Sequence, residues 1–399
     1  MGIFSWHKER EELALVFDVG SSSVGGAFVL TQKSGIPKII FSVRELISLQ
    51  ETLNPEKFLS ATIKSLEIVA SKIYKAGLGA PKAVFCVLSS PWHSSQTRVI
   101  RLEKNTSFVF TSKLAENLIQ KEISLFEEEY LAKYRDAQSP VRSIEFKNIK
   151  TALNGYETSN PLNQKVKELE MTVFISVSPE QVLKKIEETI MHFFHFKEIE
   201  FSSFVLASFV VVRNLYTNQD NFILIDVGGE VTDIAMIKKN ILRESISFPL
   251  GSNFIVRRVA SLLHSSFNEA KSIVSLLKDG HATESEAKKV GLIIDELKTE
   301  WLSKFQESLA NLSNDISIPS TIFVSVEKDL ADFFCEIIGT EQFNQYTLTE
   351  SKFKIVLLSA EVFHGLIQFG ENAIRDASLI VGSIYINRFV INSAKAEQA

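Results

Sequence analysis

Residues 15–30 place chemically useful side chains between two apolar runs. The stretch reads "LVFDVGSSSVGGAFVL", and its turn carries one acid, one glycine and three hydroxyl side chains: Asp18, Gly20, Ser21, Ser22 and Ser23. A turn of small residues leaves its main-chain N–H groups open to a phosphate, and a carboxylate at a strand end can hold a magnesium ion through water. The pattern therefore predicts a phosphate-binding turn in which Asp18 is directed at the metal.

The second half of the chain repeats this pattern. The stretch "NFILIDVGGEVTDIAM" again joins two apolar runs, and the residues of interest at its turn are Asp226, Gly228, Gly229, Thr232 and Asp233. An offset of 208 residues superposes Asp18 on Asp226. One such turn is commonly a plain hairpin, whereas two copies in repeated strand–turn–strand segments predict an internal duplication. The two turns would grip one triphosphate from both sides, with magnesium near Asp18 and Asp226.

The composition predicts a folded cytoplasmic protein with no nucleic-acid partner. Apolar residues make up 45% of the 399 residues, and 43 basic residues stand against 48 acidic ones, for a net charge of −5. This balance is too mild to attract DNA or RNA. The cysteines, Cys86 and Cys335, lie in apolar runs, which suits a reducing compartment. The N-terminus lacks the apolar core of a signal peptide, and no apolar run is long enough for a membrane span.

Hydrophobic periodicity predicts the elements of the first segment. Apolar runs at 13–19, 24–30 and 37–43 are typical of three strands joined by short turns. A helix follows, which Asn54 begins as N-cap and Gly77 ends.

The middle of the chain reads as a separate α+β segment followed by helices. A strand is predicted from residue 82, an amphipathic helix from about 113 to 134, and a further strand up to residue 178. The sequence Ser-Pro-Glu-Gln from Ser178 is a capping box that would open a helix running to His195. Residues 252–312 are predicted to be rich in helix.

The boundaries between these segments predict four consecutive parts. They are a first lobe in two pieces (1–81 and 179–215), an inserted domain between those pieces (82–178) and a second lobe (216–399).

The two turns resemble the first and second phosphate motifs of the actin-like ATPase superfamily. Within that superfamily the chain most resembles the cell-division protein FtsA and its relative PilM of type IV pili. Residues 82–178 lie where those families carry an inserted domain, and "IRDASLIVGSIY" from residue 374 is similar to their final helix. The resemblance implies an α/β, actin-like (ribonuclease H-like) two-lobed fold, with a duplicated five-stranded mixed sheet plus a small inserted α+β domain. It also implies ATP and Mg²⁺ as cofactors.

The chain departs from these families where they contact adenosine. Their third motif is a strand that ends in paired glycines, and the matching stretch at 319–334 has Ser325-Val326-Glu327-Lys328 there instead. A second placement of that motif, "KIVLLSAEVFHGL", offers Ser359-Ala360, which is no better. Side chains at either place would obstruct the adenine.

Two further departures concern the ribose and the phosphates. Family members tend to carry a Glu and a Lys one turn apart on the helix after the second motif, where this chain aligns Lys271 and Val274. Many FtsA sequences have a lysine where this chain has Ser23. We therefore expect ATP binding to be weakened or lost, and whether ATP and Mg²⁺ bind stays open. No residue stands out as a positioned base, so no catalytic residue is assigned and efficient ATPase activity is not expected.

The resemblance implies a scaffold that assembles with other proteins. An FtsA-like role predicts binding to the tubulin-like division protein and self-association, whereas a PilM-like role predicts binding to a short peptide of an inner-membrane pilus protein. The inserted domain would be the docking surface. The alternative is an active ATPase or sugar kinase of the same superfamily, and a sugar kinase would need an acidic catalytic base that the sequence does not reveal.

Membrane contact is expected to be indirect or through the N-terminus. The apolar side chains of Ile3, Phe4 and Trp6 precede Lys8 and Arg10, a minimal form of an interfacial anchor. FtsA proteins usually end in a basic amphipathic helix, whereas this chain ends in "NSAKAEQA", which favours a PilM-like protein or recruitment by a partner. We expect a cytoplasmic protein that lies peripherally at the inner face of the membrane.

Two other signals have plain structural interpretations. His192 and His195 are spaced to share a metal, but no third ligand is evident and their surroundings, "MHFFHF", favour helix packing. Ser89, Ser90 and His93 lack the context of a nucleophile elbow and are expected to form the loop that enters the inserted domain.

Overall fold

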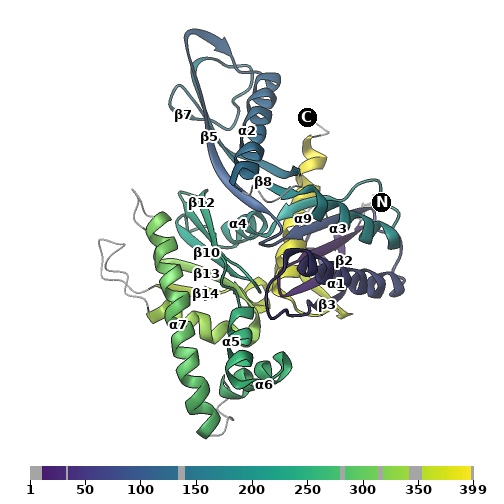
Figure 1. Cartoon of the computed structure of the whole chain (residues 1–399). Coiled ribbons are helices and arrows are strands. Elements are labelled where there is room, and N and C mark those ends of the chain that lie inside the picture. Colours follow the sequence, from purple (N-terminus) through teal and green to yellow (C-terminus); the bar gives the residue numbers. More distant parts are fainter. Residues whose placement is uncertain are drawn as a thin grey trace, which may run out of the picture. The chain divides into compact units, whose positions relative to one another are not determined.

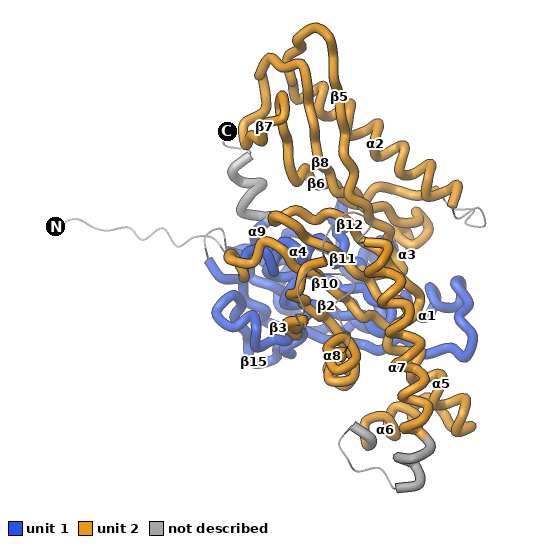
Figure 2. The backbone as a smooth tube through the Cα atoms, turned by 90° about the vertical axis from the view of Figure 1, so that its left-hand side faces the viewer, with its two compact units in different colours: residues 1–88, 186–215, 358–399 blue, residues 89–185, 216–357 orange. Residues whose placement is uncertain are grey.

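The computed structural model describes residues 11–32, 35–133, 140–278, 284–312, 318–340 and 353–396 (Figure 1). The chain divides into two compact units, drawn in blue and orange in Figure 2. Unit 1 comprises residues 1–88, 186–215 and 358–399, and unit 2 comprises residues 89–185 and 216–357. The N-terminal segment with Ile3, Phe4 and Trp6 lies outside the described residues.

Unit 1 is built on a six-stranded mixed sheet of order β15-β3-β2-β1-β4-β9. Its strands are β1 (Glu12–Val19), β2 (Ser23–Thr31), β3 (Lys38–Leu46), β4 (Ala83–Leu88), β9 (Glu200–Ser203) and β15 (Gln368–Asn372). The first three form an antiparallel meander, and β4 is parallel to β1.

Helices cover both faces of this sheet. They are α1 (Pro55–Lys75), α4 (Phe204–Leu215) and α9 (Ala377–Ala396), and α3 (Glu180–Phe193) spans the division between the units. A Cβ on Gly26 would lie 2.4 Å from Ile73 of α1, and one on Gly25 would lie 3.3 Å from Leu379 of α9. Because successive strand residues point to opposite faces, α1 and α9 lie on opposite sides of the sheet. As predicted, Asn54 caps α1 by accepting a 3.0 Å hydrogen bond from the Lys57 N–H.

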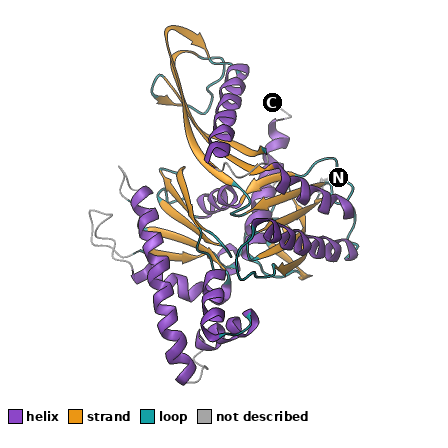
Figure 3. Cartoon of the chain, in the orientation of Figure 1, coloured by secondary structure: helices purple, strands orange, loops and turns teal. Residues whose placement is uncertain are grey.

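Unit 2 contains a second mixed sheet, of order β12-β11-β10-β13-β14. Its strands are β10 (Phe222–Val227), β11 (Thr232–Lys238), β12 (Ile241–Phe248), β13 (Thr321–Val326) and β14 (Lys354–Leu357). The accompanying helices are α5 (Asn253–Leu263), α6 (Phe267–Lys278), α7 (Glu284–Leu312) and α8 (Ala331–Thr340), with the short helix η1 (Lys328–Leu330) (Figure 3). The buried rings of Trp301 and Phe305 stack on α7.

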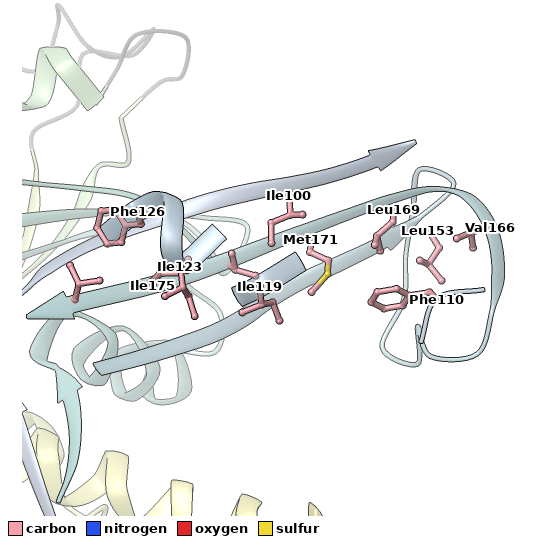
Figure 4. Close-up of a cluster of buried hydrophobic side chains, with 12 residues drawn as sticks. Ile100, Phe110, Ile119, Ile123, Phe126, Leu153, Val166, Leu169, Met171 and Ile175 are labelled. Atoms are coloured by element: carbon pink, nitrogen blue, oxygen red, sulfur yellow. The ribbon is translucent and has the colours of Figure 1, made fainter. Parts of the chain in front are cut away.

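The inserted part of unit 2 is a four-stranded antiparallel sheet of order β5-β8-β6-β7 with one helix. Its elements are β5 (Ser94–Val109), α2 (Ser112–Lys133), β6 (Val141–Leu153), β7 (Tyr156–Glu157) and β8 (Lys165–Pro179). Figure 4 shows the core between α2 and the sheet, where Ile119, Ile123 and Phe126 meet strand residues such as Met171 and Ile175. The insert therefore has a hydrophobic core of its own.

The two large sheets share one topology. The order β3-β2-β1-β4-β9 in unit 1 repeats as β12-β11-β10-β13-β14 in unit 2, and in both a meander is followed by a parallel strand. The predicted duplicated five-stranded sheet is present, and β15 adds a sixth strand to the first copy by pairing with β3.

Some predicted boundaries differ from the structure. The second lobe was expected to extend to residue 399, but β15 and α9 belong to unit 1, where α9 packs on β1, β2 and α4. The inserted domain was expected to begin at residue 82, but β4 pairs with β1 in the first sheet. An apolar run alone does not say which sheet a strand joins, so the sequence could not fix either boundary.

The helix predicted to follow Ser178 is present, but it begins at Glu180 rather than at Pro179 and ends at Phe193. Strand β8 continues to Pro179, and the Ser178 hydroxyl donates a 2.7 Å hydrogen bond to the Trp92 carbonyl. Among the described residues, no helix is both long and apolar enough to cross a bilayer.

Candidate functional site

The two predicted turns have the same backbone. The Gly20 N–H donates to the Ser23 carbonyl at 3.1 Å, and the Gly228 N–H donates to the Val231 carbonyl at 3.0 Å. The strand registers match too, since Asp18 lies opposite Gly25 and Asp226 lies opposite Asp233. These equivalent positions are all 208 residues apart, so the duplication seen in the sequence extends to individual hydrogen bonds.

Asp18 is bound by an arginine of its own sheet. One Arg44 nitrogen, Nη2, donates to Asp18 Oδ2 at 2.6 Å, and another, Nη1, donates to Ser23 Oγ at 2.8 Å. The same guanidinium donates to Asp376 through Nε and through Nη2, the latter at 2.8 Å. All three guanidinium nitrogens are therefore engaged at the first turn.

The strand register explains how Arg44 reaches Asp18. Asp18 on β1, Gly25 on β2 and Arg44 on β3 lie directly across from one another. Because Gly25 has no side chain, the guanidinium can cross β2, and a Cβ there would stand 2.7 Å from Arg44 Nη2. Asp376 enters from the start of α9, where its carboxylate also accepts the Leu379 N–H at 3.0 Å.

Burial sets the electrostatics of this cluster. Desolvation raises the pKa of Asp18, the neighbouring Asp376 carboxylate raises it further, and Arg44 opposes both effects. For Arg44, burial lowers the pKa, but the carboxylates of Asp376 and Asp18 outweigh burial and raise it. Arg44 is therefore a permanent cation beside a carboxylate whose side chain is only 5% exposed.

The second turn is closed by a different ion pair. Glu230 is buried, and its two carboxylate oxygens accept hydrogen bonds from Arg257 of α5 at 2.6 and 2.8 Å. Asn253 donates to the same carboxylate at 2.8 Å. The start of α5 also packs on the turn backbone, since the Ser252 N–H bonds to the Gly228 carbonyl at 2.8 Å.

Thr232 and Asp233 bind other parts of unit 2. The Thr232 hydroxyl donates to the Leu250 carbonyl at 2.6 Å and accepts from the Trp301 indole at 3.3 Å. Asp233 is buried and accepts hydrogen bonds from Ser90, at 2.8 Å, and from Ser247. Burial raises the pKa of Asp233, whereas the hydroxyls of Ser247 and Ser90 lower it.

Asp226 is less buried than Asp18. It stands opposite Asp233 in the β10–β11 ladder and beside Ser325 in the β10–β13 ladder. Asp226 belongs to unit 2 and Asp18 to unit 1. That these two carboxylates face one ligand stays a prediction.

The expected adenosine position has the backbone of a strand followed by a short helix. At the first of the two predicted placements, strand β13 ends at Val326 and η1 begins at Lys328. That either placement lies beside a nucleotide stays a prediction. Lys271 and Val274 lie on α6, the helix expected beside the ribose.

The first turn does not fit a divalent metal ion. Magnesium needs oxygen ligands, and the Asp18 oxygen that accepts from Arg44 lies 2.6 Å from a cation. A metal ion there would have to displace the guanidinium or be repelled by it.

The loop that enters the inserted domain is polar and buried. Ser90 binds Asp233, as described above, and His93 Nδ1 shares a 3.0 Å hydrogen bond with Ser95 Oγ. Burial lowers the pKa of His93 to about 4, and its Nε2 has no hydrogen-bond partner within the described ranges. His192 lies edge-on against Phe193, and the described residues contain no group of three or more His, Cys, Asp or Glu able to hold a metal.

Sequence reasoning missed the partners of both turns. Arg44 could have been found, because the hairpin register puts Gly25 between it and Asp18. Asp376 lies 332 residues from Arg44 in sequence, so no local pattern indicates it. Glu230 stands within the second motif, but its burial depends on Arg257 from a later helix.

Comparison with known proteins supports this architecture. Residues 223–381, which include the second turn and β13, match the family model of cell division protein FtsA. The solved PilM-PilN type IV pilus biogenesis complex is similar in fold, with a TM-score of 0.58 and 14% identity over 96% of this chain and 98% of that chain. The chain therefore shares its fold with the PilM-PilN complex, and part of its second half is similar in sequence to FtsA.

Other solved structures are similar at lower scores. MreB 5 of Spiroplasma citri bound to AMPPNP has a TM-score of 0.44 and 9% identity, covering 97% of this chain and 99% of that chain. Ethanolamine utilization protein EutJ from Carboxydothermus hydrogenoformans has a TM-score of 0.39 and 12% identity, covering 95% and 90%. No curated protein sequence matches the chain.

Proposed function

We propose that this FtsA/PilM-like protein is a non-enzymatic scaffold at the cytoplasmic face of the membrane, where it assembles with cell-division or pilus proteins. The observation that carries the proposal is the state of the two phosphate turns. Both have the same turn backbone, and Arg44 binds the carboxylate of one while Arg257 binds the glutamate of the other. The nucleotide site is accordingly degenerate, and assembly does not depend on ATP turnover.

The inserted sheet is the proposed docking surface. It has its own core, so partners can bind it without rearranging the rest of unit 2. Its surface presents large side chains to solvent, with Phe146 51% exposed, Tyr156 80% exposed and Leu162 50% exposed. Exposed aromatic and aliphatic side chains of this kind are the anchors that protein partners use.

Two partners follow from the two branches of the resemblance. In the PilM-PilN complex a pilus protein binds a chain of this fold, and we propose the same type of partner here, a short peptide of an inner-membrane pilus protein. The FtsA match favours the tubulin-like division protein instead, together with self-association. Either partner would bring the protein to the inner face of the membrane.

The test is binding to both peptides without nucleotide. The full chain, freed of nucleotide by chelator and phosphatase treatment, is titrated by fluorescence anisotropy with the C-terminal peptide of the division protein and with the N-terminal peptide of the pilus protein. The proposal predicts saturable binding of one of them, unchanged by MgATP and weakened at least about tenfold by Tyr156→Ser with Phe146→Ser. Binding of neither peptide, together with ATP turnover by the purified chain, would favour the enzyme alternative.

A further inference from the structure

We propose that Arg44 is a built-in counter-ion that takes the place of a divalent cation at Asp18 and closes the first turn to metal. This inference rests on the degenerate nucleotide site of the proposed function, and it names the residue responsible at that turn. The inference is based on three residues that lie directly across neighbouring strands: Asp18, Gly25 and Arg44. Asp376 from α9 accepts a further hydrogen bond from Arg44.

The geometry is that of a cation held between two carboxylates. Arg44 donates to Asp18 at 2.6 Å and makes a two-nitrogen contact with Asp376, and the side-chain exposures are 22% for Arg44, 5% for Asp18 and 14% for Asp376. A fork of this kind is rigid and stronger than a single charged hydrogen bond. The guanidinium is therefore fixed at the turn, unlike a surface arginine that swings away at little cost.

The local charges explain why metal is excluded. Two carboxylates and one guanidinium leave a single net negative charge, so repulsion from the guanidinium about halves the attraction that the two carboxylates alone would exert on a divalent ion. Removing the guanidinium leaves Asp18 and Asp376 on opposite sides of the space that it filled. Carboxylate oxygens in that arrangement are the ligands that Mg²⁺ and Mn²⁺ prefer.

Gly25 supplies the room on which this arrangement depends. A methyl group at position 25 would come within 2.7 Å of Nη2 and 3.0 Å of the guanidinium carbon. The nearest atoms belong to the far end of a flexible side chain, so Arg44 would move rather than the strands. Gly25→Ala therefore pushes the cation off Asp18 while every charge stays in the protein.

The test measures Mn²⁺ binding to the full chain by electron paramagnetic resonance, with no nucleotide present. We expect the wild type to bind Mn²⁺ only weakly, and Arg44→Met to bind one ion at least about tenfold more tightly, since a charge within hydrogen-bonding distance has been removed. Adding Asp18→Asn to Arg44→Met should abolish the gain. Gly25→Ala should show a smaller gain in the same direction.

Control variants keep every outcome decisive. Arg44→Met with Asp376→Asn leaves the net charge of the cluster unchanged and removes one of its two carboxylates, so it should gain less than Arg44→Met. If Arg44→Met does not fold, Gly25→Ala takes its place. No gain in any folded variant overturns the proposal, as does tight Mn²⁺ binding by the wild type that Asp18→Asn removes. Failure of the peptide titrations would contradict the proposed scaffold function. It would not affect the proposal for Arg44, because Mn²⁺ binding is measured without a partner or nucleotide.

Discussion

The first and second turns have the same backbone, but the side chains beside them carry different net charges. In unit 1 the row across three strands is Asp18, Gly25 and Arg44, and in unit 2 the equivalent row is Asp226, Asp233 and Ser247. The first row is neutral by itself, whereas the second contains two carboxylates and no cation. The residue in the middle of each row, Gly25 or Asp233, determines whether a cation reaches the aspartate of the turn. Glycine has no side chain, so it leaves room for a long side chain to cross the central strand.

The comparison teaches that two turns with the same backbone can bind different side-chain partners. At the first turn an arginine from the same sheet binds the motif aspartate. At the second turn the equivalent row binds the loop of the inserted domain, because Asp233 accepts from Ser90. The second turn therefore links the inserted domain to the sheet of unit 2.

The largest expected effect is at the second turn. Glu230→Ala removes a buried carboxylate that accepts two bonds from Arg257 and one from Asn253, so we expect unit 2 to lose about 3 kcal/mol of stability. Urea unfolding followed by the fluorescence of Trp92 and Trp301, both in unit 2, measures the loss. Glu307→Ala, at an exposed ion pair with Lys304, is the matched control and should change little.

Acid should weaken the second turn through the neighbouring loop. Burial lowers the pKa of His93 from 6.5 to about 4. Between pH 6.5 and pH 4 the histidine is therefore protonated in the unfolded chain and neutral in the folded chain. The His93 contribution to stability is complete above pH 6.5 and is lost as the pH falls towards 4, by about 3 kcal/mol. The same fluorescence experiment at pH 7 and pH 4.5 should show a smaller loss for His93→Gln than for the wild type. Equal losses in the two proteins would show that His93 is not desolvated.

The aspartate of the first turn should matter less to stability than Glu230. In Asp18→Asn the guanidinium of Arg44 keeps its two-nitrogen contact with Asp376, so we expect a loss of only about 1 kcal/mol. Hydrogen exchange of the β1–β2 amides measures this effect inside unit 1. A loss as large as that of Glu230→Ala would mean that the two ion pairs are equivalent, contrary to the comparison.

The smallest effect concerns residual metal binding by the wild type. Because the second row carries two carboxylates and the first is neutral, weak Mn²⁺ binding should depend on Asp226 rather than on Asp18. Asp226→Asn is expected to reduce the binding about twofold to fivefold, and Asp18→Asn to leave it unchanged. Parallel titrations of the two variants, followed by electron paramagnetic resonance, measure the Mn²⁺ affinities. A larger loss of affinity in Asp18→Asn than in Asp226→Asn would contradict the charge comparison.

Much of the fold was predictable because short stretches of sequence determine its strands, helices and turns. The strand pairs around each turn, the helix begun by Asn54 and the repeat at an offset of 208 residues all follow from short stretches of sequence. What could not be predicted depends on distant segments. The pairing of β15 with β3 and the contact of Asp376 with Arg44 bring together residues more than 300 positions apart, and no periodicity encodes them.

The places of Asp18 and Asp226 in the fold were predictable, whereas the partner of Asp18 was not. Asp18 and Asp226 do end buried strands at equivalent turns, as their sequence context indicates. Composition cannot say whether such a carboxylate faces a ligand or an arginine of the same protein, because that depends on register and on the residue between them.

The measurement that tests the account most directly is calorimetric titration of MgATP into the full chain, for the wild type and Asp226→Ala. The account predicts no saturable heat for either protein up to millimolar nucleotide, because Arg44 binds Asp18 and because residues 325–328 are expected to replace the paired glycines. Micromolar binding by the wild type that Asp226→Ala abolishes would contradict it.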